Sequence, residues 1–68
     1  MPIFIYLNGE HRTAREGQTI LDLLHSLAID PQRVAIEMDR RIVKQPNWAA
    51  TELHEGARVE IVQFVGGG

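Results

Sequence analysis

The sequence contains no cysteine, one tryptophan, one tyrosine and two phenylalanines. Without cysteine the chain has no disulfide, no thiolate metal site, no thiol to carry a persulfide and no cysteine nucleophile. It also has no excess of basic charge, because 7 Lys and Arg residues stand against 9 Asp and Glu residues. The basic residues are scattered without interleaved aromatic residues, which argues against nucleic-acid binding.

Long hydrophobic runs are absent as well. The apolar residues 3–7 are followed directly by the polar Asn8-Gly9, and no basic residue precedes them. This pattern is too short for a signal peptide or a membrane span, so we expect a soluble cytoplasmic protein. A chain of 68 residues forms one small domain. A cleft with its own catalytic machinery is hard to build at this size, so we predict that the protein is not an enzyme.

Two β-hairpins are predicted from turn signals and β-branched residues. Residues 3–7 and 11–15 form strands around Asn8-Gly9, a pair that supplies the two positive φ angles of a type I′ turn. Residues 34–38 and 41–44 form the second pair around another two-residue turn. The strand over residues 11–15 is largely polar, which predicts a place at a sheet edge.

A helix is predicted to begin at Ile20. Thr19 is a suitable N-cap residue, and Asp22 stands where a capping box needs its acidic partner. Asp30-Pro31 ends the helix, because the residue before proline avoids the helical conformation. The apolar residues recur at helical spacing and predict one face that packs across a sheet: Ile20, Leu23, Leu24, Leu27 and Ala28.

The remaining residues complete a ubiquitin-like β-grasp. Residues 46–50 are predicted to form a short helical turn that packs Trp48 against the sheet edge, and residues 58–65 form the last strand. The two most apolar strands, the first and the last, are expected side by side in a mixed sheet of about five strands, with the helix on one face. The domain is predicted to span residues 1–65, with residues 66–68 as a flexible tail.

Alternation along the first and last strands predicts an apolar patch on the face away from the helix. We assign partner docking to this patch and to the residue that follows it: Phe4, Tyr6, Val62, Phe64 and Val65. The alternative is that these residues are covered by the Trp48 loop or shielded by charged neighbours.

Metal binding and catalysis by side chains are disfavoured. Ser26 is adjacent to His25 on the predicted helix, and adjacent positions do not face each other, so a nucleophile pair fails on geometry. Glu37 and Glu60 can approach across the sheet, but such carboxylates are ordinarily solvated. The histidines lie on three different elements and have no ligand spacing, so we predict no metal site: His11, His25 and His54.

The three terminal glycines carry the functional prediction. Gly66, Gly67 and Gly68 cannot build a core, and three extended residues span on the order of 10 Å. They present the Gly68 carboxylate on a thread without Cβ atoms, which suits a narrow active site in another protein. The alternative is a frayed terminus.

The whole chain resembles the sulfur carrier proteins of thiamine biosynthesis, the ThiS family of the ubiquitin-like superfamily. The Val59–Gly68 run carries the most specific part of the resemblance. Gln63 is a departure, because many members have histidine there. The other similar segments are the Asn8-Gly9 hairpin, Gly17-Gln18-Thr19 with Leu23-Leu24, residues 34–37, Ile42-Val43 and Trp48-Ala49.

The resemblance implies a carrier whose Gly68 carboxylate is adenylated by a ThiF-type enzyme that uses ATP and Mg. A persulfide sulfur, from a donor such as a cysteine desulfurase, then replaces AMP, and the Gly68 thiocarboxylate delivers sulfur to thiazole synthase, ThiG. Gly66 and Gly67 are spacers, and the chain binds no cofactor itself. The alternatives are a sulfur carrier for molybdopterin or cysteine, a ubiquitin-like modifier, for which Lys44 is the only self-linkage site, and a plain interaction domain.

Overall fold

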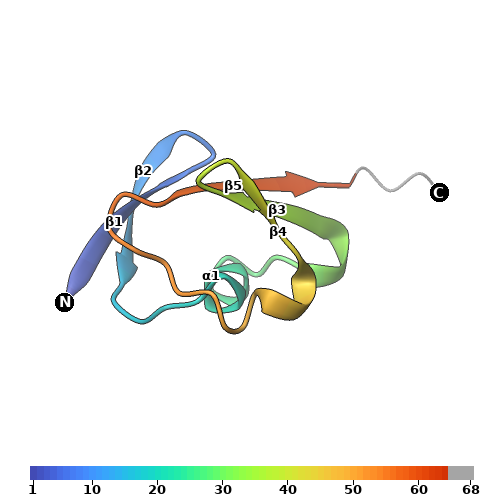
Figure 1. Cartoon of the computed structure of the whole chain (residues 1–68), viewed down its shortest axis with the longest axis horizontal. Helices are drawn as coiled ribbons and strands as arrows, with labels where there is room; N and C mark the ends of the chain where they lie inside the picture. Colours follow the sequence, from blue (N-terminus) through green and yellow to red (C-terminus); the bar gives the residue numbers. More distant parts are fainter. Residues whose placement is uncertain (65–68) are drawn as a thin grey trace.

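Five strands and one α-helix form the described part of the fold (Figure 1). The structure is a computed structural model, and it describes residues 1–64. The elements occur in the predicted order: β1 (Pro2–Leu7), β2 (Glu10–Arg15), α1 (Ile20–Ser26), the 3-10 turn Pro31–Arg33, β3 (Val34–Met38), β4 (Arg41–Val43), the 3-10 turn Gln45–Asn47 and β5 (Arg58–Gln63).

The strands form one mixed sheet in the order β2-β1-β5-β3-β4. β1 and β5 are parallel, and all other neighbouring strands are antiparallel. The first and last strands therefore lie side by side, as predicted, and α1 lies across one face of the sheet (Figure 1). This arrangement confirms the β-grasp.

Both hairpin turns use the left-handed backbone region. Asn8 and Gly9 have φ angles of 49° and 83°, which is the requirement that the sequence predicts for a type I′ turn. Asp39 and Arg40 have φ angles of 54° and 70°. Aspartate tolerates this conformation, whereas it is strained for Arg40, so contacts around the second turn have to offset the strain at that residue.

The helix begins as predicted and ends earlier. The Thr19 hydroxyl accepts from the Asp22 backbone N–H (3.1 Å), and the Asp22 carboxylate accepts from the Thr19 N–H (3.0 Å). At the other end Ala28 has a φ of 57°, and its N–H donates to the His25 carbonyl, while the Ile29 N–H donates to the Leu24 carbonyl. These bonds form a Schellman cap. Ala28 is therefore exposed and outside the helix, so its predicted place on the packing face is wrong.

The core lies between α1 and the sheet. Its fully buried side chains are Ile5, Ile20, Leu24, Ile36 and Val59. Trp48 is 3% exposed, and its Nε1 donates to the Val43 carbonyl (2.6 Å) at the end of the edge strand β4. The prediction that Trp48 packs at the sheet edge is confirmed. Among residues 1–64, no helix has the length and apolar content needed to cross a membrane.

Candidate docking site beside the end of β5

Strand β5 is held by hydrogen bonds almost to the glycines. It pairs with β3 from Met38↔Val59 to Val34↔Gln63. Beyond the strand, the Phe64 N–H still donates to the Arg33 carbonyl (2.8 Å). Regular strand structure thus ends at Gln63, whereas the sequence predicts strand at Phe64 as well. The other predicted site residues, Val65 and the three glycines, lie outside the described residues.

The Asn8 side chain continues the hydrogen bonding between β1 and β5 beyond the end of β1. Strand β1 pairs with β5 only at Tyr6↔Arg58 and Leu7↔Val59. Past this point the Asn8 side chain takes the place of another strand residue, because its Oδ1 accepts from the Ile61 N–H (2.7 Å) and its Nδ2 donates to the Ile61 carbonyl (3.3 Å). The sequence indicates Asn8 only as a turn residue. Its second role depends on the pairing of two strands more than 50 positions apart.

The predicted docking residues share the sheet face opposite the helix. Tyr6 stands opposite Arg58, and alternate residues along β5 continue on this face to Val62. Phe4 is 46% exposed, and Val62 and Phe64 are each 57% exposed, whereas Tyr6 is half-buried. Because Phe4, Val62 and Phe64 are exposed while Trp48 packs in the core, the alternative in which the Trp48 loop covers them is wrong.

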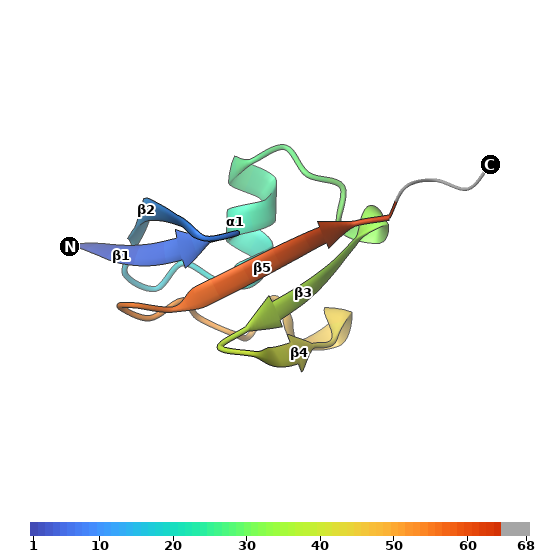
Figure 2. The same ribbon diagram turned by 90° about the horizontal axis from the view of Figure 1, so that it is seen from above.

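The strand register divides the docking residues into two groups. Val62 lies four positions beyond Arg58, which places it about 13 Å further along the sheet than Tyr6. In Figure 2, β5 continues well past the end of β1. The predicted apolar patch is therefore two separate groups on one face. We call Val62 and Phe64 the tail-end group, because they immediately precede Val65 and the glycines.

The other group is an aromatic cluster at the opposite end of β5. The rings of Phe4 and His11 stack at 5.1 Å with an interplanar angle of 5°, and Tyr6 lies 5.2 Å from His11. The Arg58 guanidinium lies 4.8 Å above the Tyr6 ring, in the geometry of a cation–π contact. His11 therefore packs against its neighbours on the sheet face.

A histidine–aspartate pair connects the β3–β4 turn to the start of β5. His54 Nε2 lies 2.6 Å from Asp39 Oδ2, and His54 Nδ1 lies 3.0 Å from the Glu55 carbonyl oxygen. Both partners only accept, so both contacts are satisfied when the ring is protonated and donates twice. The carboxylate and the carbonyl raise the pKa of His54. The Arg58 backbone N–H, which donates to Asp39 Oδ1 (3.0 Å), and His54 lower the pKa of Asp39.

This pair predicts a pH-dependent contribution to stability. A raised folded pKa for His54 stabilises the fold fully below its unfolded value of 6.5, and the contribution disappears as pH rises through the folded pKa. His54→Gln should therefore lower the free energy of unfolding by about 0.2–1 kcal/mol at about pH 5.5 and by much less at about pH 9. Urea unfolding at both pH values measures the difference. His25→Gln on the helix is the control, and a His54→Gln effect that did not change with pH would contradict an ionic origin.

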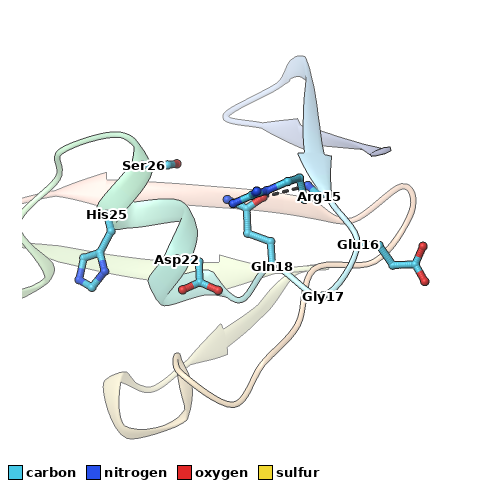
Figure 3. A pocket seen from close by; sticks show the side chains of 7 residues that line it. All are labelled: Arg15, Glu16, Gly17, Gln18, Asp22, His25 and Ser26. Atoms are coloured by element: carbon cyan, nitrogen blue, oxygen red, sulfur yellow. Dashed lines mark hydrogen bonds between the residues drawn. The ribbon is translucent and has the colours of Figure 1, made fainter. Parts of the chain in front are cut away.

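The remaining catalytic candidates are engaged in local structure. The Ser26 hydroxyl donates to the Leu23 carbonyl (2.7 Å), and His25 and Ser26 leave the helix in different directions (Figure 3). In the hollow that they line, the Asp22 carboxylate belongs to the capping box and Gln18 Oε1 accepts from the Arg15 N–H. Within residues 1–64, no three His, Asp or Glu side chains converge on a point where a metal could bind.

Comparison with known proteins places these features in a family. The ThiS family matches residues 5–68. The sulfur carrier protein ThiS of Bacillus subtilis is 34% identical over 65 residues, which cover 94% of this chain and 98% of that protein. The chain belongs to the ThiS family. The crystal structure of ThiS from Geobacter metallireducens, 26% identical, covers 97% of this chain and 100% of its own with a TM-score of 0.84.

Longer relatives contain a segment similar to this chain. Thiazole synthases of Magnetococcus marinus and Paramagnetospirillum magneticum are 39% and 36% identical to it over 64 residues. The matched segment covers 94% of this chain, but the chain spans only one fifth of the length of these two relatives. Family membership therefore rests on the ThiS family match and on the Bacillus subtilis protein.

Proposed function

We propose that this ThiS-family chain is a cytoplasmic sulfur carrier of thiamine biosynthesis and not itself an enzyme. The observation that carries the proposal is the family match, which runs through to Gly68 and so includes the glycine tail. The fold supports it, because β5 is hydrogen-bonded on both sides as far as Ile61 and on the β3 side as far as Phe64, four residues before Gly68. Because the end of β5 is held in place, the glycines that follow it can extend a defined distance into the active site of a partner.

In the proposed reaction the Gly68 carboxylate attacks the α-phosphate of ATP, and pyrophosphate leaves. A persulfide sulfur then attacks the acyl carbon and displaces AMP. Reductive cleavage of the sulfur–sulfur bond by a second thiol leaves a thiocarboxylate on Gly68. Gly66 and Gly67 act as spacers, because the absence of Cβ atoms leaves both the channel and the acyl carbon accessible. ATP and Mg belong to the activating partner in this scheme.

Three partners follow from this chemistry. A ThiF-type enzyme adenylates the carboxylate, a cysteine desulfurase supplies persulfide sulfur, and thiazole synthase receives sulfur. The Magnetococcus and Paramagnetospirillum relatives, both named thiazole synthase, support the last partner, because in each a segment similar to this chain occupies one fifth of the protein. A carrier and its acceptor that share one polypeptide would stay close together.

The docking surface in this proposal is centred on the tail-end group and Val65. A partner that receives the tail has to cover the sheet surface beside it, where Val62 and Phe64 are exposed. Exposed apolar residues of this kind are typical of protein–protein contact surfaces. Phe4 and Tyr6 belong to the same face at a greater distance, so they take part when the partner also covers the far half of β5.

Intact mass spectrometry tests the proposed function. The chain is incubated with a ThiF-type enzyme, ATP and a sulfur donor, and each component is omitted in turn. We expect a mass gain equal to replacement of one oxygen by sulfur, only in the complete mixture. Covalent attachment to other proteins would instead indicate a modifier, and an unchanged mass in every mixture would refute both.

A further inference from the structure

Two glutamates face each other on the sheet surface beside the tail-end group. Glu37 on β3 and Glu60 on β5 are direct partners in the antiparallel register, and both are exposed. Side chains at such positions have Cβ atoms about 4.5–5.5 Å apart, and like charges there destabilise the sheet. The isolated fold thus carries a repulsive pair at the centre of its outer face.

No basic side chain forms an ion pair with either glutamate among the described residues. Arg58 is the nearest basic residue along β5 on this face, but its guanidinium lies over the Tyr6 ring. The ion pairs within residues 1–64 are Arg33–Asp30 and His54–Asp39. Neither glutamate side chain accepts a hydrogen bond from another residue in that range. A cation from outside would therefore meet two carboxylates that form no ion pair and no hydrogen bond with other described residues.

Apolar residues flank the pair on two sides. Ile42 on β4 stands opposite Glu37 and is 76% exposed, and Val62 follows Glu60 on the same face of β5. The three strands are adjacent in the sheet, as Figure 2 shows. A partner that covers Ile42 and Val62 removes water from the carboxylates between them. Desolvated carboxylates bind guanidinium well, because arginine is weakly hydrated and donates two parallel hydrogen bonds.

We propose that this sheet face docks a protein surface that presents an arginine within apolar surroundings, with the guanidinium between Glu37 and Glu60. This inference rests on the proposed function in one respect, because it takes the partner to be a protein that receives the glycine tail. It adds the chemistry that the partner must show. The repulsion in the free chain becomes an attraction in the complex, so the pair acts against folding and in favour of binding.

Neutral variants separate these two opposite effects. Glu37→Gln and Glu60→Gln should each raise the melting temperature, and the double variant should gain little beyond either one, because one substitution already removes the repulsion. Each should weaken binding at least about tenfold, since each removes an attraction to the guanidinium. The matched control is Glu16→Gln, which removes the same charge from an exposed turn outside this face and should alter neither quantity.

Surface plasmon resonance against a ThiF-type adenylating enzyme and, separately, thiazole synthase measures binding. Weaker binding of both single variants to either probe supports the proposal. Unchanged binding to both probes overturns it, as does self-association of the wild type that the double variant loses, because a second copy would then occupy the face. A chain that gains sulfur but shows no dependence on the glutamates keeps the proposed function and loses this inference. Glutamate-dependent binding by a chain that gains no sulfur supports this inference and refutes the proposed function. A wild-type chain that binds neither probe overturns both the inference and the proposed function.

Discussion

Deletion of Gly68 is expected to abolish thiocarboxylate formation and to leave the fold intact. The truncated chain still ends in a glycine carboxylate, but that carboxylate sits about 3.5 Å short of the position that an activating enzyme would use. A misplacement of about 1 Å can already cost a hundredfold in rate. The fold does not depend on Gly68, because the described pairing of β5 ends with Phe64. Intact mass reports the loss of sulfur gain, and thermal unfolding reports the unchanged fold.

The companion variant Gly68→Ala separates the effect of tail length from the effect of an added side chain at the reacting residue. It keeps the carboxylate at full length and adds one methyl group at the reacting residue. We expect slow but detectable sulfur gain, because the reach is retained while the Cβ narrows access to the acyl carbon. Full sulfur gain by the truncated chain would refute the assignment of the chemistry to Gly68.

Local signals predict most of the fold because each depends on neighbouring residues. The Asn8-Gly9 turn follows from positive φ at two adjacent positions, and the capping box follows from Thr19 and Asp22 three residues apart. The position of the helix C-terminus is harder to predict from neighbouring residues. Asp30-Pro31 sets only an outer limit, and the helix ends earlier because Ala28 adopts a left-handed conformation that is usual for glycine.

The arrangement of the docking face could not be predicted, because it depends on register. Alternation along β1 and β5 correctly assigns Phe4 and Val62 to one face, but only the pairing of Tyr6 with Arg58 shows how far apart they lie. The contact of His54 with Asp39 has the same origin, since it joins residues 15 positions apart through the start of β5. Sequence periodicity contains no information on the offset between strands.

The functional prediction also has one part that the residues themselves support and one part that they leave open. The glycine tail, Gly66 to Gly68, indicates a presented carboxylate from residue chemistry alone. That chemistry does not distinguish sulfur transfer from protein modification, because both begin with an activated terminal glycine. The family match removes part of the ambiguity, since it extends over residues 5–68 and includes the Val59–Val65 run before the glycines.

Phe64→Asp is expected to weaken docking much more than it weakens the fold. Phe64 is 57% exposed, and its described hydrogen bond to Arg33 uses the backbone, which the substitution keeps. The free energy of unfolding should therefore change by no more than about 0.5 kcal/mol. At an interface an aromatic anchor contributes about 2 kcal/mol or more, so affinity for the ThiF-type enzyme should fall about thirtyfold. Calorimetric binding and thermal unfolding on the same samples compare the two effects.

Phe4 offers a matched control on the same sheet face. It is 46% exposed, but it lies in the aromatic cluster at the opposite end of β5 and stacks on His11. Phe4→Ala should therefore lower stability through the lost stacking and affect binding less than Phe64→Ala, which removes the ring without adding a charge. If Phe64→Ala reduced stability more than affinity, Phe64 would support the fold and not the complex. Equal binding losses at the two positions would instead show that a partner covers the whole length of β5.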